Sequence, residues 1–355
     1  MATWKDKTSI TLDSGQPAIA QAPQIISASR STDIPAFYTD WFFHRLAVGY
    51  SAWTNPFNGV KSYVSYKNTR FIIFWSKNPR PLLAHLGELR DRDINCYVQF
   101  TLNDYEAEGL EKNVPPLGER IETFHLLAEA LGRDGVVWRF DPLILTDTMG
   151  VDELLRKVEN IGGQLKDGTE RLVFSYADIL EYRKVKANLD KSSIAYRIWD
   201  KAEMEQFAEG VSRLNEAWGY KLATCGEKID IAKYGIGHNR CIDGDLIVRR
   251  AYRDKVLMDF MGVKIMTPEM SFFSDSTIPD GAIMLNSGQY FLSVHKKDKG
   301  QRELCGCMAA KDIGEYNTCP HQCEYCYANA NKDAATANYR RAIETGLKCE
   351  TITGR

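Results

Sequence analysis

The sequence predicts an α/β fold, a partial or complete parallel (β/α) barrel of residues 24–227, and three observations support this prediction. Short apolar runs alternate with helical segments over this range. The runs are apolar at successive positions, which is typical of parallel strands buried on both faces. Most runs end in polar residues, and ligands in such folds bind beyond the carboxyl ends of the strands. An open doubly wound sheet is the alternative architecture.

The expected elements follow one another along the chain. Strands are expected at 24–30, 48–53, 61–66, 71–75, 96–101, 136–140, 171–175 and 221–224. Helices are expected at 37–46, 81–90, 117–131, 151–165 and 200–218. The last helix has the clearest pattern, because Met204, Phe207 and Val211 share one apolar face. Asn58-Gly59 is typical of a hairpin turn between the second and third strands.

Three further segments flank the predicted barrel. Residues 1–23 lack the apolar core of a signal peptide and are expected to form a tail or a small edge element. The alternation stops after Glu227, so residues 228–330 are expected to form an irregular, cysteine-rich segment. Residues 331–355 are expected to form a C-terminal helix and tail.

The composition limits the classes of function. The net charge of −2 gives no general attraction to nucleic acid or membranes, although a local basic groove remains compatible with it. No run of about 18 apolar residues occurs, so no membrane-spanning helix and no membrane partner are expected. The expected location is the cytoplasm. There, an odd number of cysteines, nine, favours metal-binding or catalytic thiols over disulfides.

The most informative stretch lies near the C-terminus. Cys319, Cys323 and Cys326 have the spacing C-x3-C-x2-C, and Tyr325 precedes the last of them. Three thiolates in one loop can hold three corners of a cubane 4Fe–4S cluster. The fourth iron can then bind the amino and carboxylate groups of S-adenosylmethionine, and electron transfer into the sulfonium yields a 5′-deoxyadenosyl radical. This spacing resembles the radical SAM signature.

The remaining cysteines leave alternatives open. Four of them are candidate ligands of a second centre: Cys225, Cys241, Cys305 and Cys307. They are enough for a second cubane cluster, whereas the alternative is that the first two are small buried residues. Zinc is the alternative to iron–sulfur chemistry, held by a C-x-C and a C-x2-C pair: Cys305, Cys307, Cys323 and Cys326. Cys96 and Cys349 stand alone and are expected to be inert.

Six segments carry a wider resemblance: Ser27-Ala-Ser-Arg-Ser-Thr-Asp33, Trp75-Ser-Lys-Asn-Pro79, Trp138-Arg-Phe-Asp-Pro142, Cys241-Ile-Asp243, Gln301-Arg302, and Asp312-Ile-Gly314 running to Tyr327. On these segments, residues 24–330 resemble an uncharacterised bacterial family, domain of unknown function 1848 (DUF1848). The resemblance implies a radical-SAM-like cysteine cluster at the C-terminus. The second and third segments are also similar, over a short stretch, to the spore photoproduct lyase branch of radical SAM proteins.

The chain departs from the usual radical SAM pattern in two ways. The cysteine loop normally follows the first barrel strand, whereas here it comes last, so it is expected to fold back over the barrel mouth. The Gly-Gly-Glu segment that usually supports the methionine amino group is absent, and Gly162-Gly163-Gln164 at a helix end is no substitute.

Polar residues at the expected strand ends are the candidate site residues. The catalytic candidates are Lys77, Arg139 and Asp141, and the cofactor-binding candidates are Arg30, Asp33, Asn55, Asn103, Ser175 and Tyr325. Arg139 and Asp141 share one face of a strand, where they can bind a carboxylate or sugar hydroxyls, or form a structural ion pair. Lys77 can bind a phosphate or carboxylate. His321, inside the cysteine loop, is expected to be a solvent-exposed spacer.

These features predict a radical-SAM-like enzyme with one or two 4Fe–4S clusters and S-adenosylmethionine. The expected partners are a small-molecule or nucleotide substrate and an electron donor such as flavodoxin or ferredoxin. Nucleic acid is a further candidate, because Trp53, Trp75 and Trp138 near strand ends can stack a base, although as core residues they need no such role. The alternative is a non-catalytic binding protein, stapled by zinc or an iron–sulfur cluster, with a ligand or nucleic acid at the barrel mouth.

Overall fold

A large parallel sheet forms the centre of the fold. The computed structural model describes residues 6–55, 58–268, 278–294 and 296–355. Residues 1–5 of the predicted tail, and 269–277 and 295 of the predicted irregular segment, lie outside the described residues. One eight-stranded sheet comprises β3 (Ile25–Ala28), β6 (Phe71–Ser76), β7 (Asn95–Thr101), β8 (Val136–Leu143), β10 (Arg171–Tyr176), β12 (Lys221–Thr224), β13 (Gly237–His238) and β16 (Lys311–Asp312).

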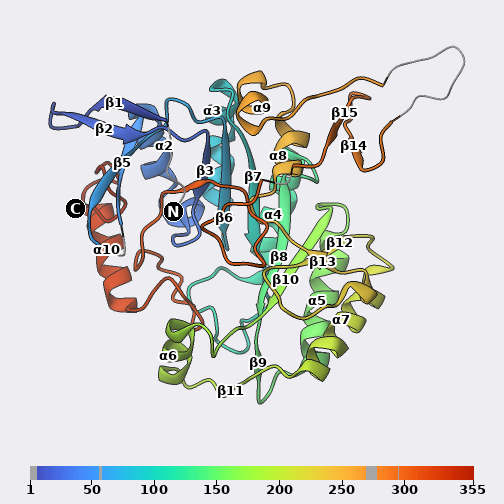
Figure 1. The fold of residues 1–355 in the computed structure, drawn as a ribbon. Coiled ribbons are helices and arrows are strands. Elements are labelled where there is room, and N and C mark those ends of the chain that lie inside the picture. Colours follow the sequence, from blue (N-terminus) through green and yellow to red (C-terminus); the bar gives the residue numbers. More distant parts are fainter. Residues whose placement is uncertain (1–5, 56–57, 269–277, 295) are drawn as a thin grey trace, which may run out of the picture.

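All strand pairs of this sheet are parallel, in the order β13-β12-β10-β8-β7-β6-β3-β16 (Figure 1). From β3 to β13 the order across the sheet is the order along the chain. The sheet therefore lacks the reversal of strand order that defines a doubly wound fold. Within the described residues the edge strands β13 and β16 do not pair with each other, so no closed barrel is formed. The predicted α/β fold with a parallel sheet is confirmed at this level.

Helices cover one face of the sheet. They are α1 (Ile34–Phe37), α2 (Thr39–Val48), α3 (Leu86–Asp91), α4 (Leu117–Leu131), α5 (Val151–Leu165) and α7 (Lys201–Asn215), with 3-10 helices at Arg80–His85 and Ala232–Tyr234. A further helix, α6 (Arg183–Lys191), lies beyond the strand ends, at the bottom of Figure 1. Alternate strand residues such as Ile26, Ile72 and Leu172 share one core cluster with Phe124 of α4 and Phe207 of α7. Burial of both faces explains why the strands are apolar at successive positions.

The opposite face of the sheet packs against the segment that follows β12. Ile25, Ile73 and Val173, the immediate neighbours of the residues above, lie in a second core cluster with Ile247 and Met258. This cluster involves α8 (Gly244–Ala251), α9 (Lys255–Met261), β14 (Ala282–Met284) and β15 (Tyr290–Leu292). The segment after Glu227 is therefore more ordered than the expected irregular chain, because it provides the apolar partner for this face.

A smaller four-stranded sheet lies beside the large one, in the order β1-β2-β5-β4. Its strands are β1 (Lys7–Thr11), β2 (Pro17–Gln21), β4 (Tyr50–Thr54) and β5 (Lys61–Ser65). The expected strands at 48–53 and 61–66 therefore exist, but their assignment to the barrel is wrong. They pair antiparallel through a hairpin, which takes them out of the parallel sheet. The remaining elements are the short pair β9 (Leu145–Thr146) and β11 (Tyr196–Arg197), and α10 (Lys332–Glu344).

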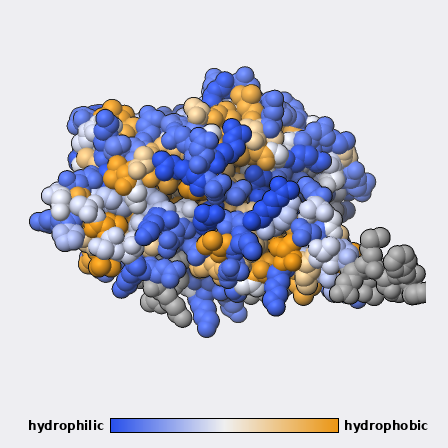
Figure 2. All heavy atoms as spheres, turned by 90° about the horizontal axis from the view of Figure 1, so that it is seen from above, coloured by the Kyte–Doolittle hydropathy of each residue, from blue (hydrophilic) through white to orange (hydrophobic). Residues whose placement is uncertain are grey.

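The surface view gives the distribution of polar groups on one face. On the face seen in Figure 2, hydrophilic residues predominate and the hydrophobic ones form separate patches. None of the described helices has both the length and the apolar character needed to cross a membrane.

Candidate functional site

A cavity of about 430 Å³ lies at the carboxyl ends of the large sheet. One side is formed by residues at the ends of β3, β6, β8, β10 and β12, among them Arg30, Lys77, Arg139, Ser175 and Cys225. Two stretches of the C-terminal segment, within 301–307 and 319–328, form the other side. The cysteine loop at the end of the chain therefore lies across the strand ends of the domain that precedes it.

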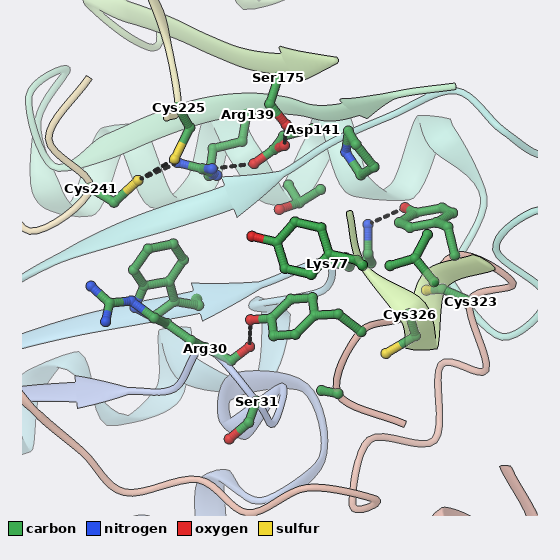
Figure 3. Close-up of a pocket in the computed structure, with 18 of the residues that line it drawn as sticks. Arg30, Ser31, Lys77, Arg139, Asp141, Ser175, Cys225, Cys241, Cys323 and Cys326 are labelled. Atoms are coloured by element: carbon green, nitrogen blue, oxygen red, sulfur yellow. Dashed lines mark hydrogen bonds and ion pairs between the residues drawn. The ribbon is translucent and has the colours of Figure 1, made fainter. Parts of the chain in front are cut away.

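Seven of the nine cysteines, all but Cys96 and Cys349, line this cavity, and each is a free thiol. They form two groups on different sides of it. We call Cys319, Cys323 and Cys326 the triplet, and we call the other group the quartet: Cys225, Cys241, Cys305 and Cys307. In Figure 3, Cys225 and Cys241 lie together beside Arg139, whereas Cys323 and Cys326 lie near Lys77.

The backbone of the triplet loop is fixed by side chains of the preceding domain. His321 Nε2 lies 2.8 Å from Asp33 Oδ2, and His321 Nδ1 lies 3.1 Å from the carbonyl oxygen of Asn113. The amide of Asn188 donates to the carbonyl of Cys326 at 2.8 Å. His321 is only 1% exposed, so its expected role as a solvent-exposed spacer is wrong. It anchors the loop instead.

A buried charge network lies behind the triplet. Lys77 Nζ lies 2.6 Å from Glu111 Oε1 and donates to Tyr325 Oη at 2.8 Å. Tyr325 Oη also donates to Glu111, and Asn103 Nδ2 donates to the same carboxylate at 2.9 Å. Burial acts to raise the pKa of Glu111, but Lys77 and Arg120 outweigh it and lower the pKa to about 2. Lys77 is thus paired with a carboxylate and holds Tyr325, the residue between two triplet cysteines.

Cys323 is buried and the other two triplet cysteines are partly buried, and loss of water around each thiol raises its pKa above the ordinary value. The charge of neighbouring triplet cysteines also raises the pKa values of Cys319 and Cys323. Lys77 acts in the opposite direction, toward lower pKa values of Cys323 and Cys326. Without a further cation the three positions hold neutral thiols, and a bound metal is the usual means of deprotonating such a set.

The quartet has direct contacts between its members. Cys225 Sγ and Cys241 Sγ lie 3.3 Å apart, and the amide of Ile242 donates to Cys307 Sγ at 3.4 Å. Hydrogen bonds from Cys225 and Cys307 lower the pKa of Cys241, in addition to the effect of Arg139. Cys307 also contacts Cys305, so both of these cysteines associate with Cys225 and Cys241, not with the triplet. This disfavours the zinc site expected from Cys305, Cys307, Cys323 and Cys326.

Two arginines flank the quartet on a shared aromatic ring. The guanidinium carbons of Arg30 and Arg139 lie 5.5 and 5.4 Å from the ring centroid of Trp75. Arg139 donates to Asp141, which also accepts a hydrogen bond from Ser175. Burial acts to lower the pKa of Arg139, but Cys241 and Asp141 outweigh it and hold the pKa above its ordinary value. The ion pair with Asp141 that the sequence left open is present.

Most of the residues selected from the sequence line the cavity. These are Arg30, Asp33, Lys77, Arg139, Asp141, Ser175, Tyr325 and the seven cysteines. Asn103 and Asn55 are not among the lining residues. Asn103 is buried behind the cavity and bonds Glu111, Tyr325 and the backbone of Asp141. Asn55 follows β4 in the small sheet, where its amide donates to the Val60 carbonyl at 3.0 Å.

Sequence reasoning missed Glu111 and gave His321 no binding role. Glu111 lies in an irregular stretch between β7 and α4, and no local pattern distinguishes it there. The only signal for His321 is its position between two predicted ligands.

In the described ranges no set of three or more His, Cys, Asp or Glu residues is arranged to hold a single metal ion. An iron–sulfur cluster makes a different demand, since each of its thiolates binds a different iron atom.

Comparison with known proteins gives one match. A family model described as "Domain of unknown function (DUF1848)" matches residues 25–328. No curated protein and no solved structure matches the chain. The matched range includes the eight-stranded sheet and both groups of cysteines.

Proposed function

The chain belongs to the DUF1848 family, and from the chemistry of its cavity we propose that it is a radical-SAM-like iron–sulfur enzyme. Its cofactors in this proposal are a 4Fe–4S cluster on the triplet and S-adenosylmethionine. The observation that carries the proposal is the convergence of Cys319, Cys323 and Cys326 on a cavity at the strand ends. Parallel α/β folds place their ligands at this end of the sheet.

The donor set of the triplet fits a cubane cluster with one iron free of protein ligands. Its three thiols are free and line the cavity, with Cys323 buried and Cys319 and Cys326 partly buried, while the side chains between them are engaged elsewhere. His321 contacts Asp33, and Glu324 pairs with Lys112 at 2.7 Å and with Lys332. The four other cavity thiols of the described chain contact one another instead: Cys225 contacts Cys241, and Cys307 contacts Cys241 and Cys305.

Such a cluster supplies an open coordination position and an electron, which together allow reductive cleavage of S-adenosylmethionine. The chain's own residues then have separate tasks. Lys77, held by Glu111, fixes Tyr325 beside the triplet. Its role in this proposal is positioning, in place of the catalytic role expected from the sequence. Asp33 likewise acts on the loop, through His321.

The rest of the cavity is available to a substrate. The volume of the whole cavity, about 430 Å³, lies within the range of sites for small molecules. Trp75, Tyr182 and Tyr327 provide aromatic surfaces, and Arg302 lies over the Tyr182 ring at 5.5 Å. A small molecule or nucleotide with an aromatic and an anionic part matches this lining. An electron donor such as flavodoxin or ferredoxin completes the proposed reaction.

Anaerobic reconstitution with iron and sulfide tests the proposal. We expect a brown protein that releases 5′-deoxyadenosine from S-adenosylmethionine under a reductant, and we expect Cys326→Ala to abolish this release while the fold persists. Cys349→Ala, which changes a cysteine outside the cavity, is the matched control. A colourless protein with tightly bound zinc would contradict the proposal. Collapse of the fold in Cys326→Ala would instead favour a non-catalytic binding protein with a metal staple.

A further inference from the structure

The quartet sulfur of Cys241 is surrounded by hydrogen-bond donors. Arg139 Nη1 donates to it at 3.1 Å and Asn239 Nδ2 at 3.3 Å, and the Cys225 thiol lies 3.3 Å away. Donors aimed at a sulfur stabilise its negative charge. A small buried cysteine in an apolar core has no such surroundings. Cys96 is an example, and burial raises its pKa to about 11. Cys241 is therefore positioned as a thiolate ligand.

The backbone on both sides of the quartet is held in place. Tyr97 Oη and Gln99 Nε2 of β7 donate to the carbonyl of Cys241, at 2.7 and 2.8 Å. The amide of Met308 donates to the carbonyl of Ile242 at 3.0 Å. The chain around Cys307 is therefore paired with the chain around Cys241, and both are attached to the sheet. Thiols from three separate parts of the sequence are brought to one position by these contacts.

Positive charge accumulates beside these thiols. Arg139 is buried and pairs with Asp141. Arg30 makes no ion pair with any residue in the described ranges, and its guanidinium lies over Trp75. The Asp312 carboxylate accepts from the Arg30 backbone amide at 2.9 Å and from Ser27 Oγ at 2.9 Å. The buried guanidinium of Arg139 requires an anion nearby, and Cys241 Sγ, 3.1 Å from its Nη1, provides one. Arg30 is partly buried and shares the Trp75 ring with Arg139, which places its positive charge on the same side of the cavity.

We infer that Cys225, Cys241, Cys305 and Cys307 bind a second iron–sulfur cluster, and that Arg30 and Arg139 are its counter-ions. This goes beyond the proposed function, because it concerns thiols that the triplet site does not use. Each thiol releases its proton to solvent when it binds iron. Four cysteinates leave no iron open, so this cluster has no coordination position for S-adenosylmethionine. It also joins the α8–α9 segment to the strand ends.

Metal analysis of anaerobically purified and reconstituted protein tests the inference. The wild type should contain about eight irons and eight sulfides per chain, and Cys241→Ser should lose about half of both. Cys323→Ser should lose the other half of the iron and sulfide, and Cys96→Ser should retain the full content of both. A Cys241→Ser protein with the full iron content, or one zinc per chain removed by that substitution, would overturn the second cluster.

The same series separates the two proposals. If Cys241→Ser loses its iron and Cys323→Ser loses none, the quartet cluster stands and the triplet site is wrong. If only Cys323→Ser loses iron, the triplet site stands and the second cluster is wrong. Each variant's circular dichroism spectrum shows whether it has folded, and Arg30→Gln, which leaves all thiols in place, provides a test that does not depend on removing a ligand.

The counter-ion role predicts a spectroscopic effect. Loss of a positive charge beside a cluster destabilises its reduced, more negative state, so the reduction potential should fall. In a titration followed by electron paramagnetic resonance, Arg30→Gln and Arg139→Gln should lower the potential of the quartet signal. The triplet signal, identified by its absence in Cys323→Ser, should be unchanged. Exposed Arg80→Gln is the control, and equal quartet potentials in all four proteins would overturn the counter-ion role.

Discussion

The Nε2 atom of His321 lies 2.8 Å from the Oδ2 atom of Asp33, and this contact joins the triplet loop to the turn that follows β3. Asp33 also caps α1 through the Ala36 amide, at 3.0 Å, and accepts from the Lys77 amide at 2.7 Å. One carboxylate thus links the first strand of the large sheet, the neighbouring strand β6 and the C-terminal cysteine loop.

Replacement of this histidine should loosen the loop. His321→Ala leaves Asp33 with its other donors but removes two contacts of a buried side chain, so we expect the free energy of unfolding to fall by about 1–3 kcal/mol. Iron transfer to a chelator should become faster for the triplet. Urea unfolding and chelator kinetics measure both effects. His125→Ala, at an exposed position on α4, should change neither. A His321→Ala protein with wild-type iron release would rule out the anchoring role.

The Lys77–Glu111 pair predicts strong coupling between two substitutions. Lys77→Met leaves Glu111 buried beside Arg120, 3.8 Å away, and should cost about 3–5 kcal/mol of stability. The double variant Lys77→Met/Glu111→Gln should recover much of this loss, because no uncompensated carboxylate remains. Urea unfolding of the two single variants and the double variant gives the coupling energy.

Activity distinguishes the two roles of Lys77. If Lys77 acts only through the Glu111–Tyr325 contact, cleavage of S-adenosylmethionine should return in the double variant together with stability, because a glutamine oxygen at position 111 still accepts from Tyr325 Oη. If it is catalytic, stability should return without cleavage. Recovery of stability alone would therefore contradict the positioning role.

Lys311 predicts a pH-dependent gain in stability. Burial lowers the pKa of this lysine to about 8, although Asp312 opposes the shift, and Nζ lies 3.7 Å from the ring centroid of Trp53. In the unfolded chain the pKa is about 10.4. Between these values the unfolded chain binds more protons, so the wild type gains stability as pH rises from about 8 to about 10.4.

Lys311→Met removes the cost of burying this charge. It should be more stable than the wild type by about 1–2 kcal/mol at pH 7, after allowance for the lost contact with Trp53. The difference should shrink as pH rises above about 8. Urea unfolding at a series of pH values measures it, with exposed Lys61→Met as the control. A constant difference across the series would contradict the lowered pKa.

Gly162 and Gly163 in α5 predict opposite effects of one substitution. A Cβ at Gly162 would lie 2.7 Å from the Trp218 ring, whereas nothing lies within 4 Å of one at Gly163. Gly162→Ala should therefore destabilise the protein by about 1–3 kcal/mol, and Gly163→Ala should stabilise it by up to about 1 kcal/mol. Thermal unfolding measures both. Neither change should alter binding of S-adenosylmethionine, because neither glycine lines the cavity. A loss of binding in Gly163→Ala would contradict that view.

Local patterns were sufficient for most elements of the large sheet. The helices expected at 117–131 and 151–165 match α4 and α5, and the strand expected at 221–224 matches β12. These elements have continuous signals: an apolar stripe at helical spacing, or an apolar run between polar residues. The position of β4 and β5 could not be read in this way, because a strand's own residues do not specify which sheet it joins.

Most of the site could be predicted from one general rule, and the prediction failed at residues to which that rule does not apply. Polar residues at parallel strand ends gather at one edge, which explains Arg30, Lys77, Arg139 and Ser175 in the cavity. Asn103 also follows a strand, but its side chain bonds the buried network behind the cavity. The burial of His321 depends on contacts with residues about 200 and 290 positions earlier in the chain, and spacing alone contains no information about them.

The pairing of β16 with β3 has a consequence for synthesis on the ribosome. The first strand of the large sheet acquires its outer neighbour only when Lys311 and Asp312 have been made, and the triplet follows later still. Until then the edge of β3 is exposed and the cavity lacks one wall. A nascent chain therefore has no finished pocket to protect a metal centre from oxygen. In the proposed iron–sulfur enzyme, iron insertion at the triplet would follow translation of nearly the whole matched region.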